Sequence, residues 1–427
     1  MRPLLAAAYE GIARLATLAA AVAPSGKAKL SQALSARRGI TERFHSWGQT
    51  NRDAARPLVW VHAPSVGEGL QARPVLERLR ALRPDVQLAY THFSPSAASF
   101  ASRLDVDFRD YLPFDTARDA RAALDALRPS ALAFSKLDVW PTLTREAGQR
   151  GVRLGLISAT LSQGSSRRRP AAAVFLRDAY RRLDVVGAID EADAERLVEL
   201  GVRPEVIEVT GDTRYDQVWM RAATADRAGP LLGPLASSRP TVVAGSTWPA
   251  DERVLLDAWQ RVRRDVPAAR PIIAPHEPTR EHLAPIERWA DAVGLSWARL
   301  SESIAPRADV IVVDRVGVLG DLYALANVAF VGGGFHRAGL HSVVEPAAFG
   351  APVVFGPRWK MSRDAALLLS ARAAATVEDV QSTAARLREW LASTDARRAA
   401  GDRARNVVRT GVGAAERTVA LLVRLLE

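Results

Sequence analysis

Residues 58–69 read LVWVHAPSVGEG, an apolar run followed by a short turn that contains serine and glycine. A continuous apolar run of about five residues, bounded by turn residues, is typical of a strand buried on both faces of a parallel sheet. Gly67 relaxes the turn, and Glu68 lies near the start of the helix that we expect next. The segment therefore predicts the first strand–loop–helix unit of an α/β fold.

Two series of such units follow one another along the chain. The expected strands of the first series are Leu58 to His62, Gln87 to Thr91, Ala131 to Phe134, Leu154 to Ser158 and Val185 to Ile189. Those of the second series are Thr241 to Ala244, Pro271 to Ala274, Val310 to Val313, Val328 to Val331 and Pro352 to Phe355. Gly-Pro and Ser-Ser pairs interrupt the pattern between residues 217 and 240, as expected of a linker. We therefore predict two Rossmann-like, doubly wound parallel-sheet domains that face a cleft.

The predicted organisation has five parts along the chain. They are an N-terminal membrane-interface helical segment at 1–40, a first domain at 41–220, a linker at 221–240, a second domain at 241–410 and a C-terminal helix at 411–427. The last helix, about Gly413 to Leu426, is amphipathic, and we expect it to pack back across the linker.

The composition narrows the classes of partner and site. The 427-residue chain has no cysteine, which excludes disulfides, thiolate chemistry and cysteine-ligated metals. Its 58 basic and 47 acidic residues give a net charge of +11, which favours anionic partners, although arginines scattered over solvated helix surfaces produce the same excess. Nucleic acid is not expected, because aromatic residues make up only 6% and no DNA- or RNA-binding module is recognisable. The seven histidines show no metal-ligand spacing, so no metal is expected.

Residues 3–23 are mostly alanine and leucine but contain Glu10 and Arg14 near their middle. A membrane-spanning helix needs about 20 apolar residues with few or no charges, so these two side chains argue against a span. The shorter run from Leu15 to Ala23 also fits a signal peptide. We expect a helix that lies in the membrane interface or packs on the protein body. The basic residues that follow it and would meet anionic headgroups are Lys27, Lys29, Arg37 and Arg38.

Ligands of open parallel sheets bind beyond the carboxyl ends of the strands, so the loops there are the first place to seek a site. Glu68 in the first loop has two interpretations: a carboxylate stabilised by the helix dipole, or a general base that takes a proton from a hydroxyl group. In the second half, the glycines at 332–334 suit either a tight turn or close approach of backbone amides to a phosphate. Ser246 and Thr247 suit either a phosphate contact or a cap for a helix that starts near Asp251.

The stretch from Val59 to Glu68 resembles the opening motif of the 3-deoxy-D-manno-octulosonic acid (Kdo) transferases of lipopolysaccharide assembly. Further segments resemble the motifs of that family in the same order: THFSPS at 91–96, YLPFD at 111–115, VWP at 139–141, ISATLS at 157–162, GDTRYD at 211–216, AGST at 244–247, FVGGG at 330–334, His341, EPAA at 345–348 and GP at 356–357. The resemblance implies a GT-B fold and an inverting, metal-independent transfer of Kdo from CMP-Kdo to a lipid A precursor, at the cytoplasmic face of the inner membrane.

The resemblance also implies roles for individual residues. Glu68 falls on the proposed general base of the family, and Glu345 falls where the ribose of the donor is held. The predicted donor-binding residues are Ser246, Thr247, His276, Arg280, Gly317, Gly332, Gly333, Gly334, His341 and Glu345. The predicted acceptor-binding residues are His62, Ser65, Gly67, Ser94, Ser96, Lys136 and Asp138. Candidates for pairing with acceptor phosphates are Arg37, Arg38, Lys136 and Arg167 to Arg169. No cofactor other than the nucleotide-sugar donor is expected, and the oligomeric state is not predicted.

Several polar positions depart from the family pattern. Its Glu-x-Glu is here Lys136, Leu137 and Asp138, and its Pro-Arg-His-Pro is here residues 275–278, with His276 in place of the arginine. The loop at Gly317 lacks the carboxylate of the family. Three alternatives to a diverged Kdo transferase therefore stay open. They are a related transferase that uses another nucleotide-activated sugar, a non-catalytic membrane-associated protein of the same fold, and a UDP-sugar epimerase of that fold.

Overall fold

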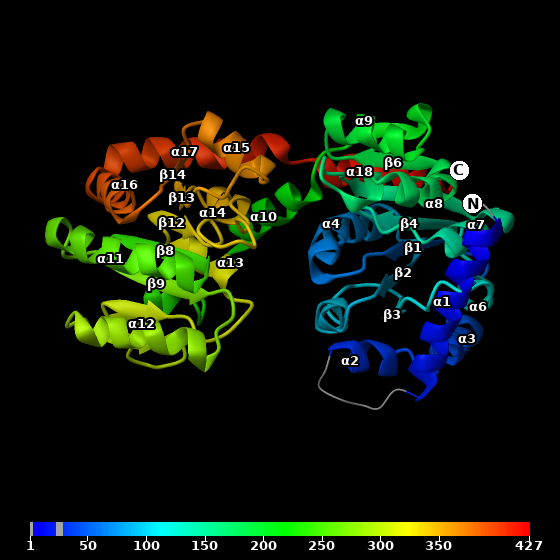
Figure 1. The fold of residues 1–427 in the computed structure, drawn as a ribbon, viewed down its shortest axis with the longest axis horizontal. Helices are drawn as coiled ribbons and strands as arrows, with labels where there is room; N and C mark the ends of the chain where they lie inside the picture. The colour runs from blue at the N-terminus through cyan, green and yellow to red at the C-terminus, as the bar shows by residue number, and fades with distance from the viewer. Residues whose placement is uncertain (1–2, 23–28) are drawn as a thin grey trace. The chain divides into compact units, whose positions relative to one another are not determined.

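The computed structural model describes residues 3–22 and 29–427, which form two compact α/β units (Figure 1). The first unit comprises residues 1–217 and 413–427, and the second comprises residues 218–412. The chain therefore leaves the first unit after Gln217 and returns to it at Gly413. Residues 221–240, which we expected to be a linker, belong to the second unit and include the end of one helix.

The first unit is built around a seven-stranded, wholly parallel sheet with the strand order β3-β2-β1-β4-β5-β6-β7. Its strands are β1 (Leu58–His62), β2 (Gln87–His92), β3 (Phe108–Tyr111), β4 (Ala131–Ser135), β5 (Arg153–Ala159), β6 (Val185–Ala188) and β7 (Ile207–Val209). The central strands β1, β2 and β4 are buried along their whole length, because helices cover both faces of the sheet. Its helices are α1 (Pro3–Val22), α2 (Lys29–Ser35), α3 (Ile40–Thr50), α4 (Val66–Leu82), α5 (Ala98–Ala101), α6 (Ala117–Leu127), α7 (Pro141–Gln149), α8 (Pro170–Arg181), α9 (Glu191–Leu200), the first part of α10 (Thr213–Thr224), and α18 (Ala414–Val423).

The second unit repeats this plan with the strand order β10-β11-β9-β8-β12-β13-β14, again wholly parallel. Its strands are β8 (Thr241–Thr247), β9 (Arg270–Pro275), β10 (Trp297–Arg299), β11 (Val310–Val312), β12 (Val328–Val331), β13 (Val353–Phe355) and β14 (Ala374–Thr376). Its helices are α11 (Pro249–Asp265), α12 (Arg280–Ala292), α13 (Leu319–Leu322), α14 (Val344–Ala348), α15 (Arg363–Ser370), α16 (Val380–Ala392) and α17 (Thr394–Gly411). The fold class predicted from the sequence, two Rossmann-like parallel sheets with helices, is confirmed.

Both sheets have a point where the direction of strand progression reverses. In the first unit it lies between β1 and β4, and in the second unit it lies between β8 and β12. The loops after these paired strands diverge to opposite faces of the sheet, which leaves room for a ligand at the carboxyl edge. A site in either unit is therefore expected at residues 62–68 with 135–140, and at residues 246–251 with 332–341.

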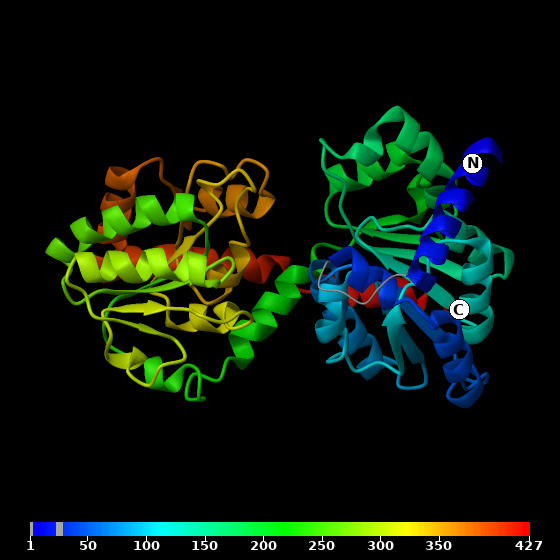
Figure 2. The same cartoon turned by 60° about the horizontal axis from the view of Figure 1, so that its bottom comes forward.

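One carboxylate holds together the two places where the chain passes between the units. Asp216, near the end of the first-unit part of α10, accepts hydrogen bonds from the amides of Gly413 at 2.7 Å and Ala415 at 2.9 Å. These amides lie at the start of α18, so Asp216 supplies the N-terminal anion of a helix nearly 200 residues away. Figure 2 shows this last helix among the N-terminal elements, and its Val419 and Leu422 share a buried core with β1 and α4. The C-terminal helix therefore belongs to the first unit.

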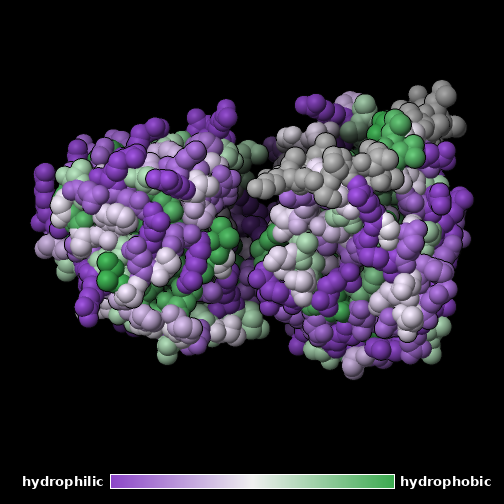
Figure 3. Space-filling view, turned by 90° about the horizontal axis from the view of Figure 1, so that it is seen from below, coloured by the Kyte–Doolittle hydropathy of each residue, from purple (hydrophilic) through white to green (hydrophobic). Residues whose placement is uncertain are grey.

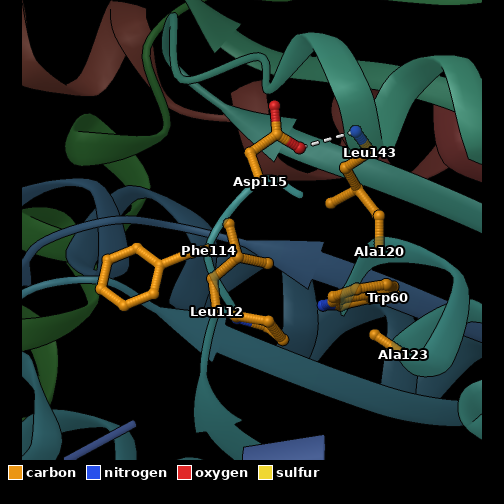
Figure 4. Close-up of a pocket in the computed structure, with 8 residues that line it drawn as sticks. Trp60, Leu112, Phe114, Asp115, Ala120, Ala123 and Leu143 are labelled. Carbon is orange, nitrogen blue, oxygen red and sulfur yellow. Dashed lines mark hydrogen bonds between the residues drawn. The ribbon is translucent and has the colours of Figure 1, made fainter. Parts of the chain in front are cut away.

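The N-terminal helix α1 packs on the first unit with one face. The Tyr9 hydroxyl donates to Asp115 at 2.8 Å, and the Glu10 carboxylate accepts from the Ala117 amide at 3.1 Å. Asp115 also accepts from backbone amides at the start of α7, including that of Leu143, and the loop that carries it lines a small, mostly apolar pocket (Figure 4). Burial raises the pKa of Asp115 to about 6. Glu10, one of the two charged side chains that argue against a membrane span, therefore anchors the helix to the first unit.

The opposite face of α1 is apolar and open to solvent. Ile12, Leu15 and Leu18 are each about two-thirds exposed, whereas most of the surface in Figure 3 is hydrophilic. No helix in the described part of the chain combines the length and the apolar character needed to cross a bilayer. Of the two alternatives for this segment, packing on the protein body is seen, and a position in the membrane interface stays a prediction. Lys27 lies outside the described residues.

Candidate functional site

The loop after β1 places Glu68 in the first turn of α4. Ser65 is the N-cap of this helix, and its hydroxyl accepts from the Gly67 amide at 3.2 Å. The same hydroxyl donates to one carboxylate oxygen of Glu68. The other oxygen accepts from the Lys136 ammonium at 3.2 Å, and Lys136 follows directly after β4. The strand-order reversal thus brings two residues that are 68 positions apart into an ion pair.

The environment of Glu68 holds it in the charged form. Its half-buried position opposes ionisation, but the bond from Ser65 and the charge of Lys136 stabilise the carboxylate more strongly, so the pKa of Glu68 is lowered from its usual value. Lys136 has the left-handed backbone angle φ of 67°, which is uncommon for a residue with a side chain. Its amide donates to Ile157 at 2.8 Å, and this bond helps to hold the lysine at the carboxylate.

A directed chain of hydrogen bonds lies beside this pair. Trp60 donates from Nε1 to the Thr91 hydroxyl at 2.9 Å, and that hydroxyl lies 3.0 Å from Nδ1 of the buried His62. Nε2 of His62 lies 3.3 Å from the Asp138 carboxylate. A carboxylate can only accept, so His62 carries its proton on Nε2 and Thr91 donates to Nδ1. Burial alone would raise the pKa of Asp138. Hydrogen bonds from His62 and Trp140 outweigh this effect, so the pKa of Asp138 is lowered from its usual value.

Two of the remaining predicted acceptor residues, Ser94 and Ser96, lie on a loop that contacts the loop of Glu68. The Ser94 amide donates to Pro64 at 2.8 Å, which places that loop against the loop of Glu68, and the hydroxyls of Ser94 and Ser96 lie 2.8 Å apart. Arg167 lies 3.6 Å from Asp138. Acceptor contacts by His62, Ser65, Gly67, Ser94, Ser96, Lys136 and Asp138 stay predictions.

Arg37 does not serve as a free cation, contrary to our expectation. It is 4% exposed and donates to the carbonyls of Leu112, Ala33 and Phe93. Its guanidinium also lies 4.0 Å from the centre of the Phe93 ring. Burial lowers its pKa to about 10. Arg37 is therefore a structural residue that ties the N-terminal segment to the loops after β2 and β3, and it cannot reach a headgroup or an acceptor phosphate.

In the second unit, the loop after β8 presents Trp248 at the carboxyl edge of the sheet. The ring of Trp248 stacks on His276 at 4.6 Å and on His336 at 4.4 Å between ring centres. Its Nε1 donates to Nε2 of His341 at 3.0 Å. Burial and the two neighbouring histidines lower the pKa of His341 to about 4. Two predicted donor residues, His276 and His341, are thus brought together by an aromatic residue that the sequence did not single out.

The glycine loop after β12 is held in place by hydrogen bonds to a buried carboxylate, that of Asp251. Asp251 accepts from the amides of Gly333 at 2.7 Å, Phe335 at 2.9 Å and Trp248 at 2.9 Å. The amide of Gly332 donates to Gly245. Phosphate binding through the amides of Gly332 and Gly333 is therefore wrong as an expectation, because both are used within the fold. A side chain at Gly332 would collide with the backbone of Ser246, so this glycine permits the close approach of two loops.

The other predicted donor residues lie on loops at the same carboxyl edge. Ser246 has a left-handed φ of 52°, and Thr247 is buried with its hydroxyl donating to Glu252 at 2.8 Å. Neither residue caps a helix, since α11 begins at Pro249 with Trp248 as N-cap. Arg280 starts α12 and is exposed, Gly317 lies in the exposed loop after β11, and Glu345 lies in the first turn of α14. Donor binding by Ser246, Thr247, His276, Arg280, Gly317, Gly334, His341 and Glu345 stays a prediction.

Sequence reasoning missed Trp248, His336 and Asp251. The signal for Asp251 was its position three residues after Trp248, where an acidic side chain commonly caps a helix. Trp248 and His336 lie in loops beyond neighbouring central strands, and only their shared edge suggests that they meet. Among the described residues, no group of three or more His, Asp or Glu side chains is arranged to hold a metal ion.

Comparison with known proteins identifies the family. A family model described as 3-deoxy-D-manno-octulosonic-acid transferase (kdotransferase) matches residues 32–217. The chain is 30% identical over 390 residues to the 3-deoxy-D-manno-octulosonic acid transferase of Bordetella pertussis, covering 87% of this chain and 89% of that protein. The chain belongs to the Kdo transferase family. It is also 31% identical to the enzyme of the same name from Chlamydophila psittaci, over 73% of this chain and 72% of that protein.

Solved structures with two Rossmann-like domains share the fold of this chain. The UDP-GlcNAc 2-epimerase of Neisseria meningitidis aligns with a TM-score of 0.64 at 13% identity, over 86% of this chain and all of that one. A glycosyltransferase from Rickettsia africae aligns with a TM-score of 0.59 at 10% identity, over 87% and 99% of the two chains. At these identities the likeness concerns the fold alone. Family membership makes this protein a glycosyltransferase, which argues against the alternative of an epimerase.

We predict that Glu68→Gln abolishes sugar transfer while nucleotide binding is retained. The amide keeps the shape of the side chain but cannot take up a proton, and loss of a general base lowers rates by about 100- to 10,000-fold. Transfer rate and nucleotide affinity are measured on the same preparation. Glu77→Gln, an exposed change on the same helix, is the control. Normal transfer by the Glu68 variant would exclude this residue as the base.

We also predict that Lys136→Met moves the acidic limb of the pH–activity profile to higher pH. The base acts only when ionised, so activity falls as the pH drops through the pKa of Glu68. Removing the lysine charge raises that pKa, and the loss then begins at a higher pH. Arg73→Met, which removes an exposed cation from α4 that is paired with Glu77, should leave the limb in place. An unchanged limb in the Lys136 variant would show that the lysine does not tune the base.

Proposed function

We propose that this protein transfers Kdo from CMP-Kdo to a lipid A precursor, with inversion at the anomeric carbon, in the synthesis of the lipopolysaccharide core. The observation that carries this proposal is the carboxylate of Glu68, held in its charged form at the carboxyl edge of the first sheet in a chain of the Kdo transferase family. An inverting transfer needs one base on the acceptor side and no covalent intermediate, which agrees with this arrangement.

The reaction can be written through the residues at that edge. An acceptor hydroxyl gives its proton to Glu68 while its oxygen bonds to the anomeric carbon of the donor. The bond from that carbon to the phosphate oxygen breaks at the same time, and CMP leaves with the electron pair. Ser65 fixes one oxygen of Glu68, and Lys136 fixes the other. The carboxylate is thereby oriented before the acceptor arrives, so little reorganisation is needed during transfer.

The arrangement of charges supports a phosphorylated acceptor. Glu68 and Asp138 are 16% and 25% exposed, whereas their partners Lys136 and Arg167 are 44% and 38% exposed. Carboxylates therefore lie deeper and cations lie nearer to solvent. A phosphate group of the acceptor would meet the cations first, and its hydroxyl would then reach the deeper carboxylate. This supports a lipid A precursor rather than an uncharged glycan.

For the donor, we infer that the second unit binds the nucleotide at the edge formed by the loops after β8, β9 and β12. Glu345 has the chemistry to accept from both ribose hydroxyls. The reaction is expected to need no metal ion and no cofactor beyond CMP-Kdo. Where the family resemblance would place an arginine on the anionic groups of the donor, this chain has His276.

We further propose that the enzyme works at the cytoplasmic face of the inner membrane, with α1 as its contact. The exposed stripe of Ile12, Leu15 and Leu18 would enter the headgroup region. Arg14, whose side chain is 70% exposed, lies on the same helix, and Arg121 lies on α6, which Glu10 caps. Both cations would face anionic headgroups while Tyr9 and Glu10 hold the helix to the body.

A side-by-side binding measurement with CMP, UDP, GDP and TDP tests the donor. Selective thermal stabilisation by CMP is expected, because binding to the native state raises the melting temperature according to the affinity. Selective stabilisation by UDP or GDP would contradict Kdo transfer and favour another nucleotide-activated sugar. The absence of any stabilisation would favour a non-catalytic protein of this fold.

Co-sedimentation with vesicles tests the membrane contact. The protein is expected to pellet with vesicles that contain anionic lipid, and the triple change Ile12→Gln, Leu15→Gln and Leu18→Gln should release it. Leu82→Gln, at an exposed leucine on another helix, is the matched control and should still pellet. Equal pelleting of the triple variant would show that α1 does not carry the membrane contact.

A further inference from the structure

Four aromatic rings from three loops form a stack at the carboxyl edge of the second sheet. The ring cluster consists of Trp248, His276, His336 and His341. His276 lies over two other rings, with its centre 4.6 Å from that of Trp248 and 4.5 Å from that of His341. His336 also stacks on Trp248, at 4.4 Å. Trp248 therefore stacks with two imidazoles, those of His276 and His336.

Hydrogen bonds hold two of the three imidazoles in their neutral form. Nε2 of His341 accepts from Trp248, and Nδ1 of His336 accepts from the Ala338 amide at 3.2 Å. A ring nitrogen that accepts carries no proton, so each of these rings has its single proton on the other nitrogen. His276 is exposed and makes no hydrogen bond through its ring among the described residues, so it is the ring that is free to take up a proton without breaking a bond.

The surroundings of the cluster contain no carboxylate that is bonded to these rings, among the residues that the structure describes. Burial lowers the pKa of His341, and so does the proximity of two other titratable rings, His276 from the loop after β9 and His336 from the loop after β12. Asp251 is occupied by three backbone amides, and Glu252 by the Thr247 hydroxyl. Other ionisable side chains on the elements around the cluster include Glu277, Arg280, His282, Arg337, Glu345 and Arg358. Three imidazoles therefore lie together, and none of the hydrogen bonds given above joins them to a carboxylate.

We propose that the ring cluster is an anion-binding site for an acidic group of the donor, either its phosphate or the carboxylate of its sugar, and that binding is coupled to uptake of a proton at His276. This inference rests on the proposed function. It explains how a chain with histidine in place of the arginine of the family pattern can still bind an anionic donor.

Two physical effects favour proton uptake only when the anion is present. Without the anion, a charge on His276 would lie against the neutral imidazole of His341 and would gain nothing from a counterion. With the anion, the imidazolium is paired, and it also lies on the face of Trp248, where the negative ring face attracts a cation by about 0.5–2 kcal/mol. The donor therefore creates the positive charge that holds it, and product release returns the cluster to its neutral form.

Isothermal titration calorimetry of the full chain tests this coupling. CMP is titrated at about pH 7.5 in buffers that differ in ionisation enthalpy, and the dependence of the heat on the buffer gives the number of protons taken up. Uptake of up to one proton is expected, with CMP affinity rising as the pH falls from about 8.5 to 7, by at most about tenfold per pH unit. This range stays above the second phosphate pKa of about 6, so the ligand itself does not titrate. Cytidine, which lacks the phosphate, should bind without uptake.

The variants separate charge from structure. His276→Gln should lose the uptake and weaken CMP binding, whereas His276→Lys should keep binding, lose the uptake and become independent of pH. His45→Gln, at an exposed histidine on α3, is the control and should behave as the native protein.

Uptake with CMP-Kdo but not with CMP would assign the site to the sugar carboxylate. Binding of both ligands without uptake, or uptake that survives in His276→Gln, would overturn the inference while leaving the proposed function intact. If neither ligand binds, both proposals fail.

Discussion

The reversal of strand order in each parallel sheet is the constraint on which the rest of the structure depends. At the junctions β1/β4 and β8/β12, successive loops leave for opposite faces and expose the carboxyl edge between them. Glu68 and Lys136 meet at the first junction, and Trp248 and His336 meet at the second. Each pair comes from segments far apart in sequence. Their contact follows from the fold and needs no local motif.

Much of the fold follows from the sequence because its central strands are buried on both faces. Leu58 to His62 and Val328 to Val331 are found with the expected bounds, since burial on both faces demands an unbroken apolar run. The strands that sequence reasoning missed are β3, β7, β10 and β14, which are the edges of the two sheets. An edge strand is short and partly exposed, as in the Ile207–Val209 strand, so it carries no continuous apolar signal.

The site was predictable to a lesser extent. Glu68 could be found because a carboxylate after a central strand stands out, and the family resemblance supplied its role. The ion pair of Glu68 with Lys136 could not be predicted, because the family pattern has an acidic residue at the position of Lys136. The glycines at 332–334 misled for a physical reason: the same lack of side chains that lets amides approach a phosphate also lets two loops pack together, and here the amides of Gly332 and Gly333 serve the loops. Arg37 misled because a buried arginine and a free one look alike in sequence.

Two residues that depart from the family pattern, Lys136 and His276, therefore make specific contacts in the folded chain. Lys136 neutralises the carboxylate that it faces, and His276 joins a stack of aromatic rings. Both changes bear on the anionic substrates that a Kdo transferase handles.

The most direct measurement combines the purified protein with CMP-Kdo and a bisphosphorylated lipid A precursor, and follows the product by mass spectrometry and its anomeric configuration by NMR. A Kdo-bearing lipid with inverted configuration, formed with release of CMP, is expected. A precursor that stays unmodified with CMP-Kdo but accepts a sugar from another nucleotide donor would contradict Kdo transfer.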